Sequence, residues 1–520
     1  SGNYRVVESG HTVILNWNEQ TVPLLRQMAS AREDGRGGLD TVVVLASKGK
    51  DEMDDVVADN DFGGMRVLTR EGKPFSATDL DRVATSSAKN VVVMQPDPEE
   101  GEESMIRERR KAASLLGLGT GGESAAANVV VQMERRLAES EDVASMASNR
   151  RMSKLGSYAK VYGRESLARI FAQTAVNPGL TSVFEEVFQQ SQDGHELYSA
   201  PATKFVGKTF NSVWRGCPDC VAIGLLHADG STELGPPDST VVQPGDRVIA
   251  LAVNAGFRLT PYSPYKPTMV RPKNFAEELV KRGKRHYVVT GDDDKMLPGI
   301  LTGLSEFCKK GDTITWVAKN AQSSTLANIG VSKVNVKCVR ADPCTLEGLQ
   351  AANISQADAA VVLPQVGDDS GEDTDANLLT TMLLVEHAGA KDTHIVGTIT
   401  NEDTLKLAHR CLPKTRTDII VYNNLIAGAL LQSITQPELR PVFDELLRSE
   451  GKEFTLRNVA GLTSEPVTFG NLQSMAREKG EILIGYIPNG EVAPVLAPPL
   501  ASKHSFNDGD VLVMLADDVE

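Results

Sequence analysis

Short runs of β-branched and other apolar residues alternate along this chain with longer amphipathic stretches. Strands are predicted where the apolar residues are continuous and helices where they recur every three to four positions. The first half gives a strand, a helix and a strand at 12–15, 21–29 and 41–45, and the second half repeats them at 286–289, 297–308 and 313–317. This alternation predicts an α/β fold with parallel sheets and right-handed crossovers.

The same order of signals continues through both halves. Later strands are predicted at 91–94 and 129–131, matched by 360–363 and 394–396. A long amphipathic helix follows in each half, is interrupted at Pro178 or Pro437, and then resumes. Each half closes with a small β unit that contains a Gly-Asp pair, Gly245-Asp246 or Gly509-Asp510. Repetition of a whole ordered series indicates an internal duplication.

Two segments lack regular periodicity. Prolines at 261, 264, 267 and 272 exclude a continuous helix or an inner strand, so the boundary between the halves is predicted to be a semi-rigid linker. The stretch 117–127 is rich in glycine, serine and alanine and is predicted to be a disordered loop.

Composition narrows the class of protein. No run approaches the roughly 20 apolar residues of a membrane-spanning helix, so we expect no direct membrane insertion. A net charge of −15 argues against nucleic acid as a partner, and six cysteines suggest a reducing compartment rather than a disulfide framework. Ser1-Gly2 resembles a cloning scar, so we expect the chain to be an excised piece of a longer protein.

The turns after the first strands lack the glycine pattern of a dinucleotide-binding fold. A G-x-G-x-x-G turn lets the backbone approach a pyrophosphate. The first half has Asn16, Trp17 and Asn18 there, and the second half has Asp292, Asp293 and Asp294 after a single glycine. A bulky indole or three carboxylates would oppose a pyrophosphate, so NAD binding of the usual kind is not expected.

Carboxylates gather instead at the predicted carboxyl edges of both sheets, where Ca²⁺ would find the hard oxygen ligands it prefers. Bound Ca²⁺ would also relieve the repulsion between clustered carboxylates, although a solvated acidic loop is the alternative. The candidate ligands are Asp97, Glu99, Glu100, Glu102, Glu103 and Glu134 in the first half, and Asp292, Asp293, Asp294, Asp368, Asp369, Glu372, Asp373, Asp375, Glu402 and Asp403 in the second.

Other motifs are weaker. Gly207-Lys208-Thr209 lacks the leading glycine of a phosphate-binding loop. Cys217 and Cys220 form a single C-x-x-C, for which two buried thiols or a turn is a simpler interpretation than zinc. No serine-elbow, zinc-protease or kinase motif is present, and we expect no enzyme activity.

The small β units resemble the C-terminal lobe of the RCK (regulator of K⁺ conductance) module. The matching stretches are 205–210, 221–224 and 244–246 in the first half, and 469–472, 482–486 and 508–510 in the second. More narrowly, the chain resembles the CASTOR/POLLUX family of plant ion channels at 13–17, 50–53, 70–74, 177–180 and 185–186. It departs from that family in the glycine-rich insertion near 117–122 and in Asn16, where the first strand would end in glycine.

The resemblance implies two tandem RCK modules, each with a Rossmann-like parallel-sheet lobe, a bent crossover helix pair and a small C-terminal α+β lobe. The expected boundaries are 1–158, 159–192 and 193–258 for the first module, 259–283 for the linker, and 284–420, 421–450 and 451–520 for the second.

The family further implies a homotetramer whose modules form a gating ring beneath a transmembrane pore carried by the same full-length chain. It implies a cation channel that Ca²⁺ regulates, located in the nuclear envelope or a plastid envelope. The bent helices, 165–189 and 425–447, are the expected contacts between modules. Two alternatives stay open: an NAD- or nucleotide-binding regulatory or oxidoreductase protein on the same sheet, and a soluble adaptor that only oligomerises.

Overall fold

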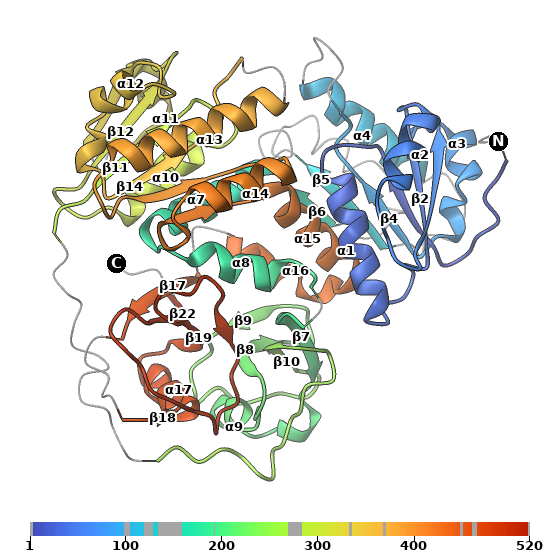
Figure 1. Ribbon diagram of the computed structural model, residues 1–520. Helices are drawn as coiled ribbons and strands as arrows, with labels where there is room; N and C mark the ends of the chain where they lie inside the picture. The colour runs from blue at the N-terminus through green and yellow to red at the C-terminus, as the bar shows by residue number, and fades with distance from the viewer. Residues whose placement is uncertain are drawn as a thin grey trace. The chain divides into compact units, whose positions relative to one another are not determined.

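The computed structural model describes residues 4–97, 104–118, 128–133, 159–191, 193–268, 283–331, 335–367, 371–447, 451–459 and 465–517 (Figure 1). The chain divides into two compact units. The first unit comprises residues 1–165, 188–193 and 423–440, and the second comprises 166–187, 194–422 and 441–520. Each unit therefore takes segments from both halves of the sequence.

A six-stranded parallel sheet forms the centre of the first unit, in the order β3-β2-β1-β4-β5-β6. The strands are β1 (Thr12–Leu15), β2 (Thr41–Ala46), β3 (Arg66–Glu71), β4 (Asn90–Val93), β5 (Asn128–Met133) and β6 (Ala159–Tyr162). Val13 pairs with Val43 on one side and Val91 on the other. Continuous apolar strands of this kind are buried on both faces, and the strand order is that of a Rossmann fold.

The helices of this unit come from both halves. The first half supplies α1 (Thr21–Glu33), α2 (Lys50–Ala58), α3 (Ala77–Arg82) and α4 (Ser104–Leu118), and the second half supplies α15 (Tyr422–Thr435). Figure 1 shows α15 beside α1, where Gln27 Nε2 donates to the Asn424 carbonyl at 2.8 Å. Asn128 Nδ2 donates to the Ile434 carbonyl at 2.9 Å, so β5 also holds α15.

The second unit contains an equivalent sheet, in the order β13-β12-β11-β14-β15-β16. Its strands are β11 (His286–Thr290), β12 (Thr313–Ala318), β13 (Asn335–Arg340), β14 (Ala359–Val362), β15 (His394–Gly397) and β16 (Thr417–Ile419). Its helices are α10 (Leu297–Phe307), α11 (Ser323–Ile329), α12 (Leu346–Ala351), α13 (Gly371–Ala388) and α14 (Glu402–Cys411). The identical strand order confirms the predicted duplication of a Rossmann-like lobe.

The crossover helices of the first half pack in this second unit. They are α7 (Arg164–Val176) and α8 (Leu180–Phe188), separated by the turn at Pro178. Ala172 lies so close to Gly303 of α10 that a Cβ on Gly303 would come within 2.9 Å of it. The Arg169 guanidinium forms ion pairs with Glu306 and Glu453, so α7 is bonded to segments of the second half.

Two four-stranded antiparallel sheets, with equivalent orders β7-β10-β8-β9 and β17-β22-β19-β20, and the two-stranded sheet β18-β21 complete the second unit. The first lobe contains β7 (Glu196–Pro201), α9 (Phe210–Arg215), β8 (Val221–Leu226), β9 (Thr232–Leu234) and β10 (Arg247–Ala252). The second contains α16 (Arg440–Leu447), β17 (Lys452–Asn458), β18 (Val467–Thr468), α17 (Phe469–Glu478), β19 (Ile482–Ile487), β20 (Val495–Leu496), β21 (Lys503–His504) and β22 (Val511–Asp517). Gly224 and Gly485 occupy equivalent sites, where a Cβ would overlap a neighbouring strand carbonyl.

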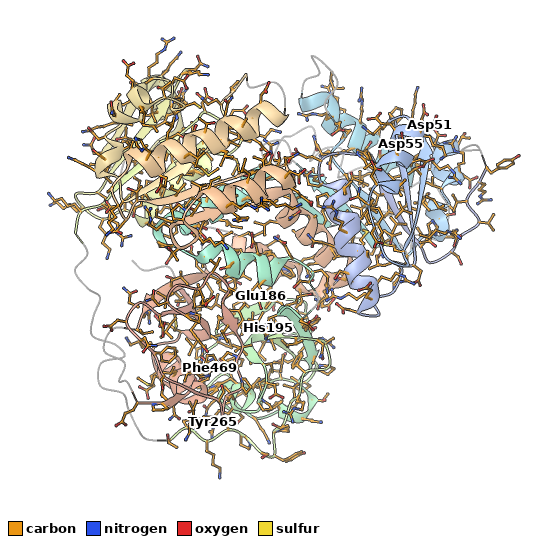
Figure 2. The ribbon with its side chains drawn as sticks, in the orientation of Figure 1. Asp51, Asp55, Glu186, His195, Tyr265 and Phe469 are labelled. Carbon is orange, nitrogen blue, oxygen red and sulfur yellow. The ribbon has the colours of Figure 1, made fainter. Side chains whose placement is uncertain are left out.

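The described part of the linker contacts both small lobes. Tyr265 N donates to the Arg215 carbonyl at 2.8 Å, and Arg215 Nε donates to the Tyr265 carbonyl at 2.7 Å. The Tyr265 hydroxyl reaches Asn471 Oδ1 at 3.0 Å, and Figure 2 shows this tyrosine near Phe469. A Cβ on Gly470 would overlap the Tyr265 ring, so the ring fits against bare backbone.

The structure bears on two further sequence-based expectations, the loop at 117–127 and the lack of a membrane-spanning helix. Gly117 and Leu118 form the last residues of α4, so the predicted loop does not begin at 117; the rest of that loop lies outside the described residues. Among the residues that the structure describes, no helix combines the length and the apolar character needed to cross a bilayer.

Replacing Gly428 by alanine should destabilise the first unit. A Cβ at this position of α15 would overlap the carbonyl oxygen of Phe188. We expect the midpoint of thermal unfolding to fall by about 3–8 °C, the usual effect of overpacking in a domain of this size. Gly49→Ala is the matched control, because a Cβ there meets only open space. Equal midpoints for the two variants would contradict close packing of α15.

Candidate functional site

A cavity of about 450 Å³ opens at the carboxyl edge of the first sheet. Open parallel sheets bind ligands at this edge. The turn after β1, the end of β2, the turn after β3, the segment after β4 and one residue of α4 supply its walls. The lining residues are Asn16, Trp17, Ala46, Ser47, Lys48, Lys73, Pro74, Phe75, Pro96, Asp97 and Arg110.

The turn after β1 keeps the backbone shape of a glycine turn without the glycine. Asn16 has a φ of 75°, a left-handed conformation that asparagine tolerates better than most residues. Its Nδ2 donates to the Met94 carbonyl at 2.9 Å, and its N donates to the Leu45 carbonyl at 2.8 Å. These bonds fasten the turn to both neighbouring strands. Asp97 N donates to the Trp17 carbonyl at 3.3 Å, which joins the two sides of the gap between β1 and β4.

A buried amide network fills the region beside this turn. Asn18 Nδ2 donates to Gln132 Oε1 at 2.9 Å and to the Gln95 carbonyl at 2.8 Å. Gln132 Nε2 donates to Gln20 Oε1 at 3.0 Å, and Gln20 Nε2 donates to Asn423 Oδ1 at 2.7 Å. Side chains from β5 and from the start of α15 thus occupy the switch point of the sheet, where a dinucleotide would place its pyrophosphate.

The charged groups of the cavity are mainly basic. Of the lining residues that the structure describes, Lys48, Lys73 and Arg110 are basic and Asp97 carries the one carboxylate. Partial burial raises the pKa of Asp97, and the nearby carboxylate of Glu19 adds to the increase, while Lys48 opposes it. Lys48 forms an ion pair with Glu52 one turn along α2. Within the described part of the chain, the Lys73 ammonium has no ion-pair partner.

Of the carboxylates predicted at this first edge, the structure describes Asp97 alone. It lies in the cavity wall with Lys48, Lys73 and Arg110, and the structure places it in no metal-like group of carboxylates among the described residues. The other predicted positions, Glu99, Glu100, Glu102, Glu103 and Glu134, fall outside the described residues.

The predicted carboxylates after β11 mostly organise backbone. Asp292 Oδ1 accepts a hydrogen bond from Val366 N at 2.7 Å. Asp293 is buried, and its Oδ1 accepts from Lys295 N at 3.0 Å and Met296 N at 3.1 Å, which fixes the start of α10. Asp294 is exposed. Asp368 and Asp369 lie outside the described residues, as does the side chain of Glu372.

Asp375 accepts hydrogen bonds from the backbone just before two other predicted positions, Glu402 and Asp403. This carboxylate is 1% exposed and accepts from Thr400 N at 3.1 Å and Asn401 N at 2.5 Å. Asn401 caps α14, whose first turn contains Glu402 and Asp403. The ends of neighbouring strands therefore converge as expected, but the Asp375 oxygens are occupied by N–H donors. In the described ranges, no group of three or more His, Cys, Asp or Glu side chains has the arrangement of a metal site.

The weaker motifs are accounted for by local bonding. Cys217 and Cys220 are free, buried thiols. His227 Nδ1 lies 3.0 Å from Asp246 Oδ1, and His195 Nδ1 lies 2.8 Å from Glu186 Oε1, a pair labelled in Figure 2. The two histidines closest in sequence to Cys217 and Cys220 are thus each bonded to a carboxylate. The 207–209 stretch leads into α9 of a small lobe and is no part of a Rossmann sheet, as expected.

A second titratable cluster lies at the bend between α7 and α8. Asp418 of β16 is buried, and its Oδ2 accepts from Gly179 N at 2.9 Å and lies 2.5 Å from His394 Nε2. His394 Nδ1 in turn faces the Ala175 carbonyl at 3.4 Å. Burial and the Asp418 charge raise the pKa of Glu185, on α8, to about 7. The bend of the helix pair is therefore bonded to β15 and β16 through ionisable groups.

The sequence did not identify the basic side chains as a site. Lys48 follows β2, Lys73 follows β3 and Arg110 lies within α4, and no local motif joins the three. The stretches around Lys50 and Lys73 carried part of the family resemblance but suggested no chemistry. Only the strand order brings them to one cavity.

A family model described as "Castor and Pollux, part of voltage-gated ion channel" matches residues 164–263. "Probable ion channel POLLUX" of Arabidopsis thaliana is 25% identical over 99% of this chain, which spans 65% of that protein. "Ion channel CASTOR" of Lotus japonicus is also 25% identical over 99% of the chain, which spans 63% of it. The chain thus spans a little under two thirds of the length of these relatives.

Among solved structures, the human SLO3 gating ring matches 98% of this chain and 99% of its own length, with a TM-score of 0.69 at 12% identity. At that identity the likeness concerns the fold alone. The predicted α/β fold, with two tandem modules that each contain a Rossmann-like parallel-sheet lobe and a small lobe, is confirmed.

Asp375→Asn should lower the free energy of unfolding by about 1–3 kcal/mol, because the carboxamide presents N–H groups to backbone donors that now bond a charged oxygen. Asp373→Asn, on an exposed position two residues earlier, should change it by less than about 0.5 kcal/mol. Urea unfolding followed by circular dichroism measures both. Similar losses in the two variants would contradict a structural role specific to Asp375.

Glu185 should make stability fall as pH rises. The pKa of Glu185 is about 7 in the folded protein and near 4.5, the ordinary value of a glutamate, in the unfolded chain. Below 4.5 both states are protonated; between 4.5 and 7 only the unfolded state loses its proton, so stability decreases across that window. Glu185→Gln should remove about 2 kcal/mol of the decrease between pH 5 and pH 8. Exposed Glu491→Gln serves as the control. An unchanged pH profile in Glu185→Gln would show that Glu185 is ionised normally.

Proposed function

We propose that this chain, a relative of the CASTOR and POLLUX ion channels along nearly its whole length, is the ligand-sensing gating-ring region of a tetrameric cation channel. The relatives are named ion channels, and the fold is that of tandem RCK modules. In this proposal the pore belongs to the same full-length protein, in a nuclear or plastid envelope. The region regulates the pore and catalyses no reaction.

The observation that carries the proposal is the exchange of crossover helices between the halves. α15, from the second half, is bonded to α1 and β5 of the first Rossmann-like lobe. α7, from the first half, is bonded to α10 and β17 through Arg169. A conformational change in either Rossmann-like lobe would therefore act directly on a helix that belongs to the other half of the chain. Such a construction suits a device that converts ligand binding into relative motion of modules.

Thermodynamic linkage between ligand binding and pore opening is the mechanism in this proposal. A ligand shifts the pore equilibrium only by the difference between its affinities for the two ring conformations. Coupling of about 1–3 kcal/mol per site is typical, so equivalent sites on several subunits are needed for a decisive shift. A tetramer supplies that repetition.

Ca²⁺ is the regulatory ligand we propose, bound at the carboxyl edge of the second sheet. Asp375 holds the start of α13 against the segment that begins α14, so Asp373, Glu402 and Asp403 lie on elements joined at one edge. The negative net charge of the chain favours a cation over an anion at an exposed acidic edge. A dinucleotide-dependent oxidoreductase is disfavoured, because Asn18 and Gln132 fill the switch point of the first sheet.

Millimolar Ca²⁺ should raise the thermal unfolding midpoint by several degrees, since a ligand that binds only the folded state stabilises it. Neutralising Asp373, Glu402 and Asp403 together should remove at least about half of this shift. The same substitutions in a full-length channel should raise the Ca²⁺ concentration for half-maximal response by about 5–150-fold, measured by cation flux into proteoliposomes.

The matched control neutralises Asp51, Asp55 and Asp59, three exposed carboxylates of the α2 region, two of which are labelled in Figure 2. This variant removes the same charge and should keep the Ca²⁺ shift. An equal loss in both variants would indicate nonspecific screening by Ca²⁺. A flux that ignores Ca²⁺ in the unmodified channel would overturn the proposed regulation.

A further inference from the structure

Residues 260–265, the linker arch, are fastened to the first small lobe at both ends. Thr260 N and Tyr265 N each donate at 2.8 Å to one of two consecutive carbonyls at the end of α9. Between these anchors Ser263 is exposed, and within the part of the chain that the structure describes no hydrogen bond engages its hydroxyl. The linker arch therefore presents an accessible hydroxyl on a short, anchored stretch of backbone.

The sequence of the linker arch is unusual for this chain. Of the 25 prolines, two follow a serine or threonine, and both are in the arch, as Thr260-Pro261 and Ser263-Pro264. An enzyme can select proline at this position, because proline has no N–H that an apolar pocket would leave unpaired. Proline-directed protein kinases make this selection, and many also prefer a basic residue three positions after the phosphorylated serine. Lys266 occupies that position for Ser263, whereas Thr260 has no basic residue there.

The structure distinguishes the two hydroxyls in the same way. Thr260 Oγ1 donates to the Gly216 carbonyl at 3.3 Å, and this threonine is half-buried. Ser263 and Lys266 are both exposed. Pro264 favours extended backbone at Ser263, and the turn before it is closed by a single long bond, from Ser263 N to the Thr260 carbonyl at 3.3 Å. Little structure has to open before Ser263 can enter an enzyme's site.

The surface beside Ser263 favours a negative group. Lys208 Nζ lies 5.3 Å from the centre of the Tyr262 ring, and Tyr262 directly precedes Ser263. The carboxylate of Asp219, on the turn after α9, is already bonded to Arg258 Nε at 2.7 Å. A phosphate carries about two negative charges and three acceptor oxygens, and opposite basic groups it orders the segment that bears it. Lys208 would be the partner of such a phosphate.

We propose that Ser263 is a phosphorylation site for a proline-directed serine/threonine kinase. The Ser263 oxygen attacks the γ-phosphorus of ATP held by that kinase, so an O–P bond forms. The bond from this phosphorus to the β,γ-bridging oxygen breaks, and ADP leaves. The hydroxyl proton passes to the catalytic aspartate of the kinase. The product phosphate bonds Lys208 and fastens the linker arch to the first small lobe.

The linker arch ends at the residue that joins the two small lobes. The Tyr265 hydroxyl reaches Asn471 Oδ1 at 3.0 Å, and its ring lies against Gly470, next to Phe469 in Figure 2. A phosphate that restricts the arch therefore restricts the contact between the lobes. The regulatory consequence rests on the proposed gating-ring function: phosphorylation becomes an input to the ring that needs no Ca²⁺.

Incubation of the whole folded chain with a cyclin-dependent kinase and MgATP tests the site. We expect one phosphate per chain, localised to Ser263 by mass spectrometry of peptides. Ser263→Ala should accept none, and Thr260→Val, the matched control in the same arch, should react at the rate of the unmodified chain. Lys266→Gln should lower kcat/KM about tenfold, because it removes a charge-assisted contact with the kinase. No phosphate, phosphate on Thr260 instead, or phosphorylation only after heat unfolding would overturn the proposal.

Amide hydrogen exchange tests the contact with Lys208. Phosphorylation should slow exchange in peptides that cover the linker arch about tenfold, because its anchoring amides exchange only when the arch opens. Lys208→Gln should remove this slowing, relative to its own unphosphorylated form, and should still accept the phosphate. Lys204→Gln, at an exposed position of the same lobe, is the control and should keep the slowing. Exchange that phosphorylation leaves unchanged, or slowing that persists in Lys208→Gln, would overturn the contact.

Both experiments are carried out without Ca²⁺ and without a pore. A chain that is phosphorylated at Ser263 and does not respond to Ca²⁺ would sink only the proposed Ca²⁺ regulation. A chain that responds to Ca²⁺ and accepts no phosphate would sink only the phosphorylation site.

Discussion

The structure depends on covering the crossover helices on more than one side. Along α7, Leu167, Ile170 and Phe171 are all nearly inaccessible to water, and along α15 the same holds for Leu425 and Leu430. A helix that is apolar around most of its circumference cannot lie on the surface of one lobe. Each half of the chain therefore requires the other, and duplication within one polypeptide satisfies both requirements at once. The mixed composition of the two units is the direct result.

The two Rossmann-like lobes share a backbone but have diverged in chemistry at their edges. Asn16 and Gly291 occupy equivalent positions after the first strand, with φ values of 75° and 92°. A Cβ on Gly291 would overlap the Leu363 carbonyl, whereas Asn16 uses its side chain to bond Met94. The same left-handed turn thus serves a basic cavity in one lobe and an acidic edge in the other. Duplication preserved the scaffold, while the side chains at the two edges diverged.

The sequence predicted the buried strands and the helices between them well, because a parallel strand covered on both faces is an unbroken apolar run. Edge strands were less visible: β13, with Lys337 and Arg340, is partly exposed and carries charge along its length. Periodicity shows that a helix has an apolar face but not which lobe covers it. Contacts between modules through the bent helices were expected only from the family resemblance, which did not say which elements α7 and α15 would contact. The cavity was hidden for a related reason, since Lys48, Lys73 and Arg110 converge only through strand order. The acidic stretches were evident in the sequence. In the structure, however, the buried carboxylates of Asp293 and Asp375 accept hydrogen bonds from backbone amides.

The Tyr265 contact joins the two small lobes of one chain. Its main chain is bonded to Arg215 of the first small lobe and its hydroxyl to Asn471 of the second. A short linker between the two modules keeps the segments that it joins at an effective local concentration in about the millimolar range. The contact between the two small lobes is therefore intramolecular, and its strength does not depend on the concentration of the protein.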